Sequence, residues 1–273
     1  QGILVRTAQI TRKVMEAEPE LKIIARHGTG LDIIDVDAAT QLGIQVTNTP
    51  ESNGPSVAEL TMGGMIAAAR KLPLLNESAK RGDFFFKTHC PGAELTGKML
   101  GLVGFGDIGR RVAQIAALGF QMDIAVYEGH MEGKPVPDYV RLVSWEELFR
   151  SADFVSLHIP MRPENENLVG KREFGWMKPS AIFVNTARGK VVCEQALLEA
   201  LESSEIAGAF LDVLSVEPFS AGHPLLNQPN VIVTPHIGSN TGEALARSGL
   251  HAAMDIVSFF RGEPLRWPVN HVY

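Results

Sequence analysis

The chain has 273 residues, 45% of them apolar and 21% charged, with a formal net charge of −6. This length suggests two domains of about 100–200 residues each, and the composition is that of an ordinary globular protein. The acidic balance argues against nucleic acid or an anionic membrane surface as the main partner. No apolar run reaches the roughly 18 residues that a membrane-spanning helix needs.

The cysteines and the N-terminal residues indicate the cellular compartment in which the protein is expected. The only two cysteines, Cys90 and Cys193, are far apart and do not form a CxxC pair. This usage indicates a reducing compartment without a disulfide framework. The opening QGILVRT has no basic-then-apolar signal pattern. We therefore expect a cytoplasmic protein.

The first 53 residues alternate short apolar runs with helical patterns. Strands are predicted at residues 3–7, 21–26 and 44–49, and helices at residues 11–18 and 33–42. Such a βαβαβ succession predicts a parallel sheet.

A punctuated stretch follows and leads into a helix. Pro50, Gly54 and Pro55 predict a linker. Ser56 with Glu59 three residues later predicts the capping box of a helix that continues through Gly63 and Gly64. The small residues of this helix fit a tightly packed interior helix or a subunit interface, and the sequence leaves both open.

A second alternating series completes the chain. Strands are predicted at 99–105, 123–128, 154–159, 181–187, 206–213 and 231–237, and helices at 108–119, 144–151, 171–177, 194–203 and 241–261. The series predicts a second α/β domain built on a parallel sheet.

The first strand of this series enters a dinucleotide-binding motif. Gly104, Gly106 and Gly109 form a GxGxxG between a predicted strand and a predicted helix, which is the context that the motif requires. The first glycine permits a tight turn, the second leaves room for a pyrophosphate, and the third lets helix and strand pack closely. The phosphates would meet free N–H groups at the positive end of the helix.

An acid at the end of the next strand indicates which dinucleotide is bound. Glu128 stands 19 residues after Gly109, close to the spacing of about 20 for a carboxylate that binds the adenosine ribose. It would repel a 2′-phosphate, and Gly129 offers no cation in compensation, so NAD is favoured over NADP. His130 could soften this preference, and Glu128 could instead merely cap a solvated strand end.

Four later strands end in polar residues: His158, Arg188, Asp212 with Glu217 close behind, and His236. Ligands of open α/β sheets bind beyond these carboxyl ends. A histidine beside a carboxylate can carry a proton at neutral pH, and an arginine can hold a substrate carboxylate in a fork. Taken singly, His158 is better explained by packing and Glu217 by a turn, whereas Arg188 could equally be a structural ion-pair partner. The set favours reduction of a 2-keto acid.

The chain resembles the D-isomer-specific 2-hydroxyacid dehydrogenases in the order RHGTGLDIIDVDAA, NTP…SVAELT, the glycine motif, HIP, NTARG, LDV…EP and TPHIGS. The resemblance implies an α/β protein of two Rossmann-like parallel-sheet domains, NAD as cofactor and a homodimer through the 56–70 helix. One domain would bind NAD, and the smaller, flavodoxin-like one would bind substrate. We expect residues 1–53 to begin the substrate-binding domain, 54–237 to bind NAD, and 238–273 to return to the first domain.

The resemblance also implies residue roles. Arg188 would bind substrate, His236 would be the general acid/base, and Glu217 its carboxylate partner. The cofactor would contact Thr29, Gly104, Gly106, Asp107, Ile108, Gly109, Glu128, Ile159, Pro160, Thr186, Ala187, Arg188, Asp212, His236 and Gly238. Asp107 and Ile108 would meet the pyrophosphate, and Asp212 the carboxamide. The substrate would contact Arg6, Gly28, Thr29, Gly30, Arg188 and His236, with the amides of residues 28–30 facing its carboxylate. We predict no metal site.

Three departures from the family pattern qualify the expected function. Family members begin with a further βαβ unit, so the smaller domain is expected to be incomplete. Glu128 replaces the usual aspartate, and Arg162 stands where a threonine is common. We expect NAD-dependent D-2-hydroxyacid dehydrogenase activity resembling the phosphoglycerate branch, with hydroxypyruvate or glyoxylate reduction as the alternative. An NADH-sensing corepressor or scaffold, or an inactive fragment, also stays open.

Overall fold

The computed structural model describes residues 1–129 and 135–272; His130 lies outside them. The chain divides into two compact units, Gln1–Ser56 with Ser239–Tyr273, and Val57–Gly238. The domain boundaries expected from the sequence lay after residues 53 and 237. None of the helices in the described ranges is long and apolar enough to cross a membrane.

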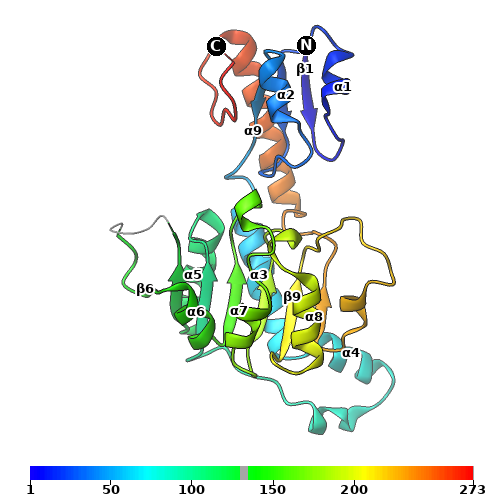
Figure 1. Ribbon diagram of the computed structural model, residues 1–273, viewed down its shortest axis with the longest axis vertical. Helices are drawn as coiled ribbons and strands as arrows, with labels where there is room; N and C mark the ends of the chain where they lie inside the picture. Colours follow the sequence, from blue (N-terminus) through cyan, green and yellow to red (C-terminus); the bar gives the residue numbers. More distant parts are fainter. Residues whose placement is uncertain (130–134, 273) are drawn as a thin grey trace. The chain divides into compact units, whose positions relative to one another are not determined.

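The first unit contains a three-stranded parallel sheet in the order β1-β2-β3. Its strands are β1 (Gly2–Val5), β2 (Ile23–Arg26) and β3 (Gln45–Thr47), and its helices are α1 (Arg12–Glu16), α2 (Val36–Gln41) and α9 (Gly242–Arg261). The long C-terminal helix α9 packs on β2 and β1 (Figure 1). The middle strand is apolar throughout its first three residues because both of its faces are covered.

The second unit contains a seven-stranded sheet in the order β10-β9-β8-β7-β4-β5-β6, with every pairing parallel. Its strands are β4 (Met99–Val103), β5 (Asp123–Tyr127), β6 (Val140–Leu142), β7 (Phe154–Leu157), β8 (Ile182–Asn185), β9 (Gly208–Leu211) and β10 (Val231–Val233). The order reverses at β4, which pairs with β5 on one side and β7 on the other. Both sheets confirm the predicted α/β fold with parallel strands.

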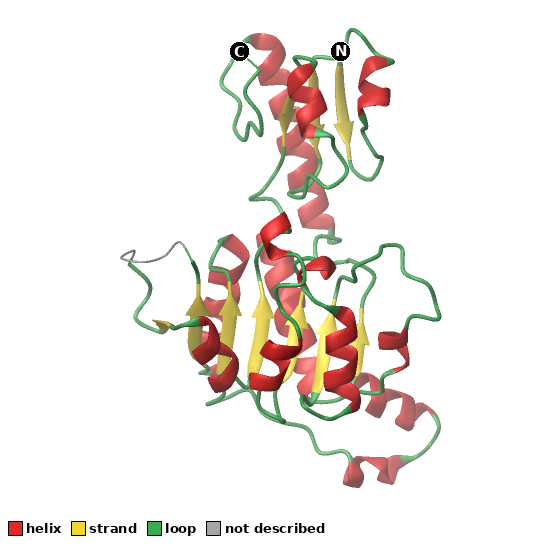
Figure 2. Cartoon of the chain, in the orientation of Figure 1, coloured by secondary structure: helices red, strands yellow, loops and turns green. Residues whose placement is uncertain are grey.

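Helices cover both faces of the larger sheet (Figures 1 and 2). The helices described in this unit are α3 (Gly54–Ala69), α4 (Leu72–Lys80), α5 (Asp107–Phe120), α6 (Trp145–Ser151), α7 (Lys171–Trp176) and α8 (Glu194–Glu202), with short 3₁₀ turns η1 (Phe84–His89), η2 (Pro163–Asn165), η3 (Gly189–Val191) and η4 (Pro224–Asn227). One apolar core lies between the sheet and α6, α7 and α8, and a second lies between the sheet, α3 and α5. Covered on both faces, the strands are almost wholly buried.

The predicted capping box at Ser56 is wrong. Helix α3 begins two residues earlier, at Gly54, and the Ser56 hydroxyl forms a 2.8 Å hydrogen bond with that of Thr241. In the same helix, a Cβ at Gly64 would lie 2.2 Å from the Phe210 ring, whereas one at Gly63 would meet nothing within 4 Å. Gly64 therefore serves interior packing, and Gly63 lies on an exposed side of the helix.

One strand and one α-helix of the second unit had no counterpart in the sequence prediction. Strand β6 has three residues at the sheet edge and two of them are exposed, so it carries almost no apolar signal. Helix α4 begins with Leu72-Pro73, where proline is tolerated because a first-turn N–H has no partner within the helix. Most observed strands are also shorter than predicted, because their polar ends belong to the loops that form the candidate site.

Candidate active site

The glycine turn after β4 has the shape that a dinucleotide needs. Gly104 has φ +98°, and a Cβ there would lie 2.6 Å from the His158 carbonyl oxygen. A Cβ at Gly109 would lie 2.5 Å from the Gly104 carbonyl oxygen, whereas one at Gly106 would meet nothing. The outer two glycines thus let the turn close on itself, and the exposed Gly106 leaves its outer surface clear for a pyrophosphate.

Glu128 is tied to this turn. One of its carboxylate oxygens accepts a 2.9 Å hydrogen bond from the Phe105 N–H. The acid at the end of β5 is thereby held beside the glycine motif, where a ribose would follow the pyrophosphate. Asp107, the first residue of α5, pairs through its carboxylate with Arg111 at 2.9 Å. A phosphate contact at Asp107 would therefore come from its backbone N–H at the helix N-terminus.

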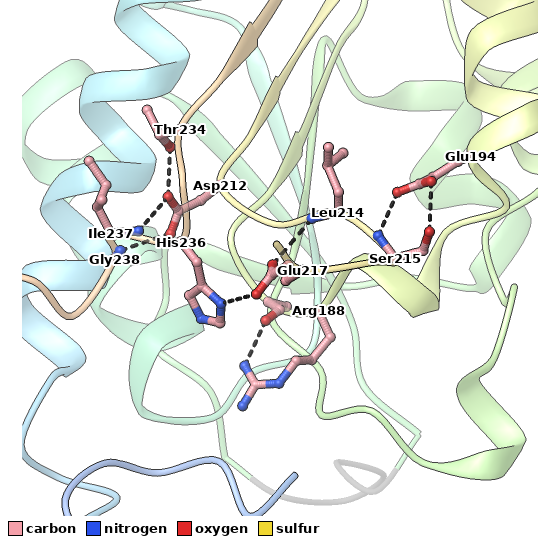
Figure 3. A network of polar contacts seen from close by, with 11 residues as sticks. Arg188, Glu194, Asp212, Leu214, Ser215, Glu217, Thr234, His236, Ile237 and Gly238 are labelled. Atoms are coloured by element: carbon pink, nitrogen blue, oxygen red, sulfur yellow. Dashed lines mark hydrogen bonds and ion pairs between the residues drawn. The ribbon is translucent and has the colours of Figure 1, made fainter. Parts of the chain in front are cut away.

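The NTARG loop after β8 is held by Asn185. Its side-chain amide donates to the Arg188 carbonyl at 3.0 Å and accepts from the Ala187 N–H at 3.0 Å. The buried Thr186 shares a 2.9 Å hydrogen bond with Thr61 of α3. The half-buried Arg188 donates from Nη1 to the Ala187 carbonyl at 2.7 Å (Figure 3).

His236 and Glu217 form an ion pair near Arg188. His236 Nδ1 lies 2.7 Å from Glu217 Oε2, and the other carboxylate oxygen accepts from the Leu214 N–H at 3.3 Å (Figure 3). His236 has φ +53°, a backbone conformation that costs energy in a non-glycine residue and that clusters at functional sites. The backbone N–H of His236 donates to the Asp212 carbonyl at 2.8 Å, which fixes the backbone from which the imidazole side chain extends.

The pair shifts both pKa values. The hydrogen bond to Glu217 is the largest influence on the pKa of His236 and raises it, against burial and the positive charge of Arg188. Burial acts to raise the pKa of Glu217, but the bond from His236, the Leu214 N–H and the charges of His236 and Arg188 together lower it. The arrangement thus favours a charged imidazolium beside a carboxylate near neutral pH.

Asp212 holds the loop that carries His236. The side chain is buried and accepts from the Thr234 hydroxyl at 2.6 Å and from the Ile237 and Gly238 N–H groups at 2.8 Å each. Burial raises the pKa of this carboxyl group, and the three donors oppose that change. The structure therefore shows a loop anchor at Asp212, and a contact of this residue with nicotinamide stays a prediction.

The segment after β7 packs beneath the glycine turn. His158 shares a 2.9 Å hydrogen bond with Ser156, and burial lowers its pKa to about 4, so its ring is neutral. The Ile159 side chain would be 2.8 Å from a Cβ at Gly104. His158 is accordingly a packing residue in this structure, while Pro160 next to Ile159 is exposed.

The residues of the first unit that are predicted to contact substrate follow the ends of β1 and β2. Arg6 donates to Asn240 Oδ1 at 3.3 Å, and the Thr29 hydroxyl to Asn53 Oδ1 at 3.4 Å. The Gly28 N–H donates to the Thr49 hydroxyl at 2.9 Å. Contacts of the amides of residues 28–30 with a substrate carboxylate stay a prediction.

Sequence reasoning missed the residues that hold these loops. Arg26 donates from Nε to the Gly30 carbonyl at 2.8 Å and from Nη1 to the Arg6 carbonyl at 2.6 Å, so it organises the glycine loop. Glu194 holds the segment before Glu217 through Ser215. Arg26 begins the RHGTGLD stretch but was given no role, and Glu194 lies outside the quoted motifs. Both roles depend on contacts with other parts of the chain.

Comparison with known proteins agrees with this geometry. Residues 62–238 match the D-isomer specific 2-hydroxyacid dehydrogenase, NAD binding domain. The chain is 43% identical to the D-3-phosphoglycerate dehydrogenase of Methanocaldococcus jannaschii over 96% of this chain and 50% of that relative. It is 44% identical to the hydroxypyruvate reductase of Thermotoga maritima over 91% of this chain and 81% of that relative.

A solved structure gives the same relationship. A D-2-hydroxyisocaproate dehydrogenase matches with a TM-score of 0.91 at 28% identity, over 99% of this chain and 86% of that one. The chain spans about half the length of the curated phosphoglycerate dehydrogenases that it matches. It belongs to the D-isomer specific 2-hydroxyacid dehydrogenase family, and its larger unit contains the family's NAD-binding domain.

Proposed function

We propose that the protein is an NAD-dependent D-2-hydroxyacid dehydrogenase. The observation that carries the proposal is the 2.7 Å contact between His236 and Glu217 in the electrostatic field of Arg188. All three residues follow strands of the NAD-binding sheet, at the edge where ligands of such sheets bind. A noncatalytic NADH sensor or scaffold would have no need for this charged pair.

The residues of the pair suit proton transfer at C2 of a 2-hydroxy or 2-keto acid. NAD, when bound, accepts the hydride of the alcohol, and NADH supplies it to the ketone. In the reductive direction His236 Nε2 donates a proton to the carbonyl oxygen, while Glu217 on Nδ1 stabilises the charged ring. Arg188 holds the carboxylate of the substrate and draws electron density from its carbonyl group.

The two units would divide this work. The unit Val57–Gly238 would bind the cofactor, and the unit Gln1–Ser56 with Ser239–Tyr273 would bind substrate through Thr29, Gly30 and Arg6. We favour 3-phosphoglycerate as the D-hydroxy acid, since the exposed guanidinium of Arg6 suits a substrate's distal phosphate. Hydroxypyruvate is the second candidate, because the chain covers 81% of a reductase with that name.

A panel of keto acids tests the proposal. Phosphohydroxypyruvate, hydroxypyruvate and glyoxylate are each incubated with the chain and NADH or NADPH, and loss of absorbance at the nicotinamide band is followed. Turnover with NADH, highest for phosphohydroxypyruvate, is expected. NADH binding without turnover of any keto acid would instead favour a sensor or scaffold.

Glu128→Ala should weaken NAD binding much more than NADP binding. Its carboxylate would accept hydrogen bonds from the ribose in NAD and would repel the 2′-phosphate of NADP. Titration with both oxidised cofactors, monitored by calorimetry, measures the two dissociation constants. Glu199→Ala, an acid on the outer part of α8, is the matched control. An equal loss of affinity for NAD and NADP would contradict the proposed contact between Glu128 and the ribose.

We also propose a cytoplasmic homodimer. Gly63 leaves an exposed side of α3 open to a close approach, and Phe84 and Phe85 of η1 expose 67% and 74% of their surface. Exposed aromatic side chains of this size are typical of association surfaces. Sedimentation equilibrium tests the dimer, and a monomer over the whole concentration range would contradict it.

A further inference from the structure

The loop between β9 and η4 carries Glu217, and an acid on another element holds this loop. Glu194, the first residue of α8, accepts from the Ser215 N–H at 2.6 Å and from the Ser215 hydroxyl at 2.7 Å (Figure 3). Its carboxylate is largely buried, with 19% of the side chain exposed. A largely buried carboxylate that accepts two short hydrogen bonds from one residue restrains that residue strongly.

The same carboxylate reaches the far end of the loop. His223 Nδ1 accepts from the Leu225 N–H at 3.3 Å, so in the neutral ring the proton lies on Nε2. That nitrogen lies 3.3 Å from Glu194 Oε2. Glu194 thus joins Ser215, two residues before Glu217, to His223, six residues after it.

The backbone of Leu214 connects the contact at Ser215 with the Glu217 carboxylate. Leu214 precedes Ser215, and its N–H donates to Glu217 Oε1 at 3.3 Å. On the other side, Gly189 lies so close that a Cβ there would be 1.9 Å from the Leu214 carbonyl carbon. Leu214 and Ser215 are therefore fixed between η3 and α8, and the Glu217 carboxylate is held against this fixed segment.

We infer that Glu194 is a positioning residue, which clamps the β9–η4 loop through Ser215 and His223 so that Glu217 stays within reach of His236. The effect of Glu194 on catalysis rests on the proposed function, whereas its effect on the position of the loop does not. A glutamine would fit this position poorly, because the three donors around it need acceptors and a side-chain amide presents one oxygen and one donor group.

The first experiment measures the clamp without turnover. The pKa of the His236 imidazole is determined by NMR titration in Glu194→Gln, Ser215→Ala and the unchanged chain. The chain has eight histidines, so the signal is assigned by its loss in His236→Asn. Both substitutions should lower the His236 pKa toward its ordinary value, because Glu217 moves away. Ser215→Ala removes no charge, so its shift cannot be a direct electrostatic effect.

The second experiment measures the consequence for catalysis. Glu194→Gln should reduce kcat with NADH and keto acid by up to about 100-fold, as expected for a small misplacement of a catalytic group, with an unchanged KM for NADH. Glu194→Asp should recover part of kcat. Glu199→Gln, on the same helix, should match the unchanged chain in pKa and kcat.

The outcomes separate the two proposals. If the unchanged chain has no turnover but both substitutions lower the His236 pKa, the clamp stands and the proposed function fails. If the His236 pKa stays unchanged in folded Glu194→Gln and Ser215→Ala, the clamp is refuted, whatever the activity. A loss of kcat that follows only the loss of thermal stability, with the pKa unchanged, refutes it as well.

Discussion

His236→Asn is expected to lower turnover by about 10²–10⁴-fold, the usual contribution of a general acid/base. Asparagine keeps a polar group of similar length and tolerates the left-handed backbone at φ +53°. Its amide group can donate a hydrogen bond but does not ionise near neutral pH, so it cannot transfer a proton and the loss falls on the chemical step. Steady-state kinetics with NADH and the best keto acid measure kcat, and fluorescence titration measures NADH binding separately, so that a loss of cofactor binding is distinguished from a loss of turnover.

A matched variant separates the proton carrier from its partner. Glu217→Gln keeps the shape of the side chain but removes the charge that raises the pKa of His236. Glu217→Gln should therefore lower kcat less than His236→Asn does, and it should move the pH profile of kcat to lower pH. Unchanged turnover in His236→Asn would exclude His236 as the acid/base and would leave the ion pair with a structural role only.

The pH dependence follows from the directions of the two shifts. Reduction needs protonated His236, whose pKa lies above its ordinary value of 6.5, so the reductive rate should fall as pH rises through that raised value. The contribution of His236 to the free energy of unfolding is complete below pH 6.5 and is lost above its raised pKa. The Glu217 contribution is complete above pH 4.5 and is lost as pH falls through its lowered pKa. The pair therefore stabilises the fold most between pH 4.5 and 6.5.

The sequence was sufficient for features that depend on local spacing. The alternation of apolar runs and helical patterns predicted both parallel sheets, because strands covered on both faces are apolar at nearly every position. The polar ends of four apolar runs predicted that His158, Arg188, Asp212 and His236 would lie at the carboxyl ends of strands. The structure adds that these strands, β7 to β10, are neighbours in the sheet. The ion pair of Glu217 with His236 joins residues 19 positions apart, and only the resemblance to a family suggested it.

Features that depend on distant contacts were beyond the sequence. The hydrogen bond from the Gly28 N–H to the Thr49 hydroxyl joins residues 21 positions apart, and no local pattern in the sequence indicated it. Gly189 follows Arg188, and its φ lies outside the left-handed region, so its backbone conformation does not require a glycine. Space is what requires a glycine there, since the backbone of Leu214 and Ser215 passes directly beside it.

Gly189→Ala should therefore destabilise the protein by about 3 kcal/mol or more, at the upper end of what overpacking costs. The added Cβ would lie 1.9 Å from the Leu214 carbonyl carbon, 2.1 Å from its oxygen and 2.4 Å from the Ser215 nitrogen. These are backbone atoms, so no side-chain rotation relieves the contact, and either η3 or the β9–η4 loop must move. Since that loop carries Glu217, turnover should fall even in the fraction that stays folded.

Urea unfolding followed by circular dichroism measures this effect, with Gly175→Ala as the control. Gly175 lies in α7, where a Cβ would meet nothing within 4 Å and where alanine is the better helix former by about 1 kcal/mol. The control should unfold at equal or higher urea, while Gly189→Ala should unfold at much lower urea. A Gly189→Ala chain that unfolds with the unchanged one would show that η3 and the loop can separate freely. In that case close packing at Gly189 could not be what holds Glu217 beside His236, and the clamp by Glu194 would have to position the loop alone.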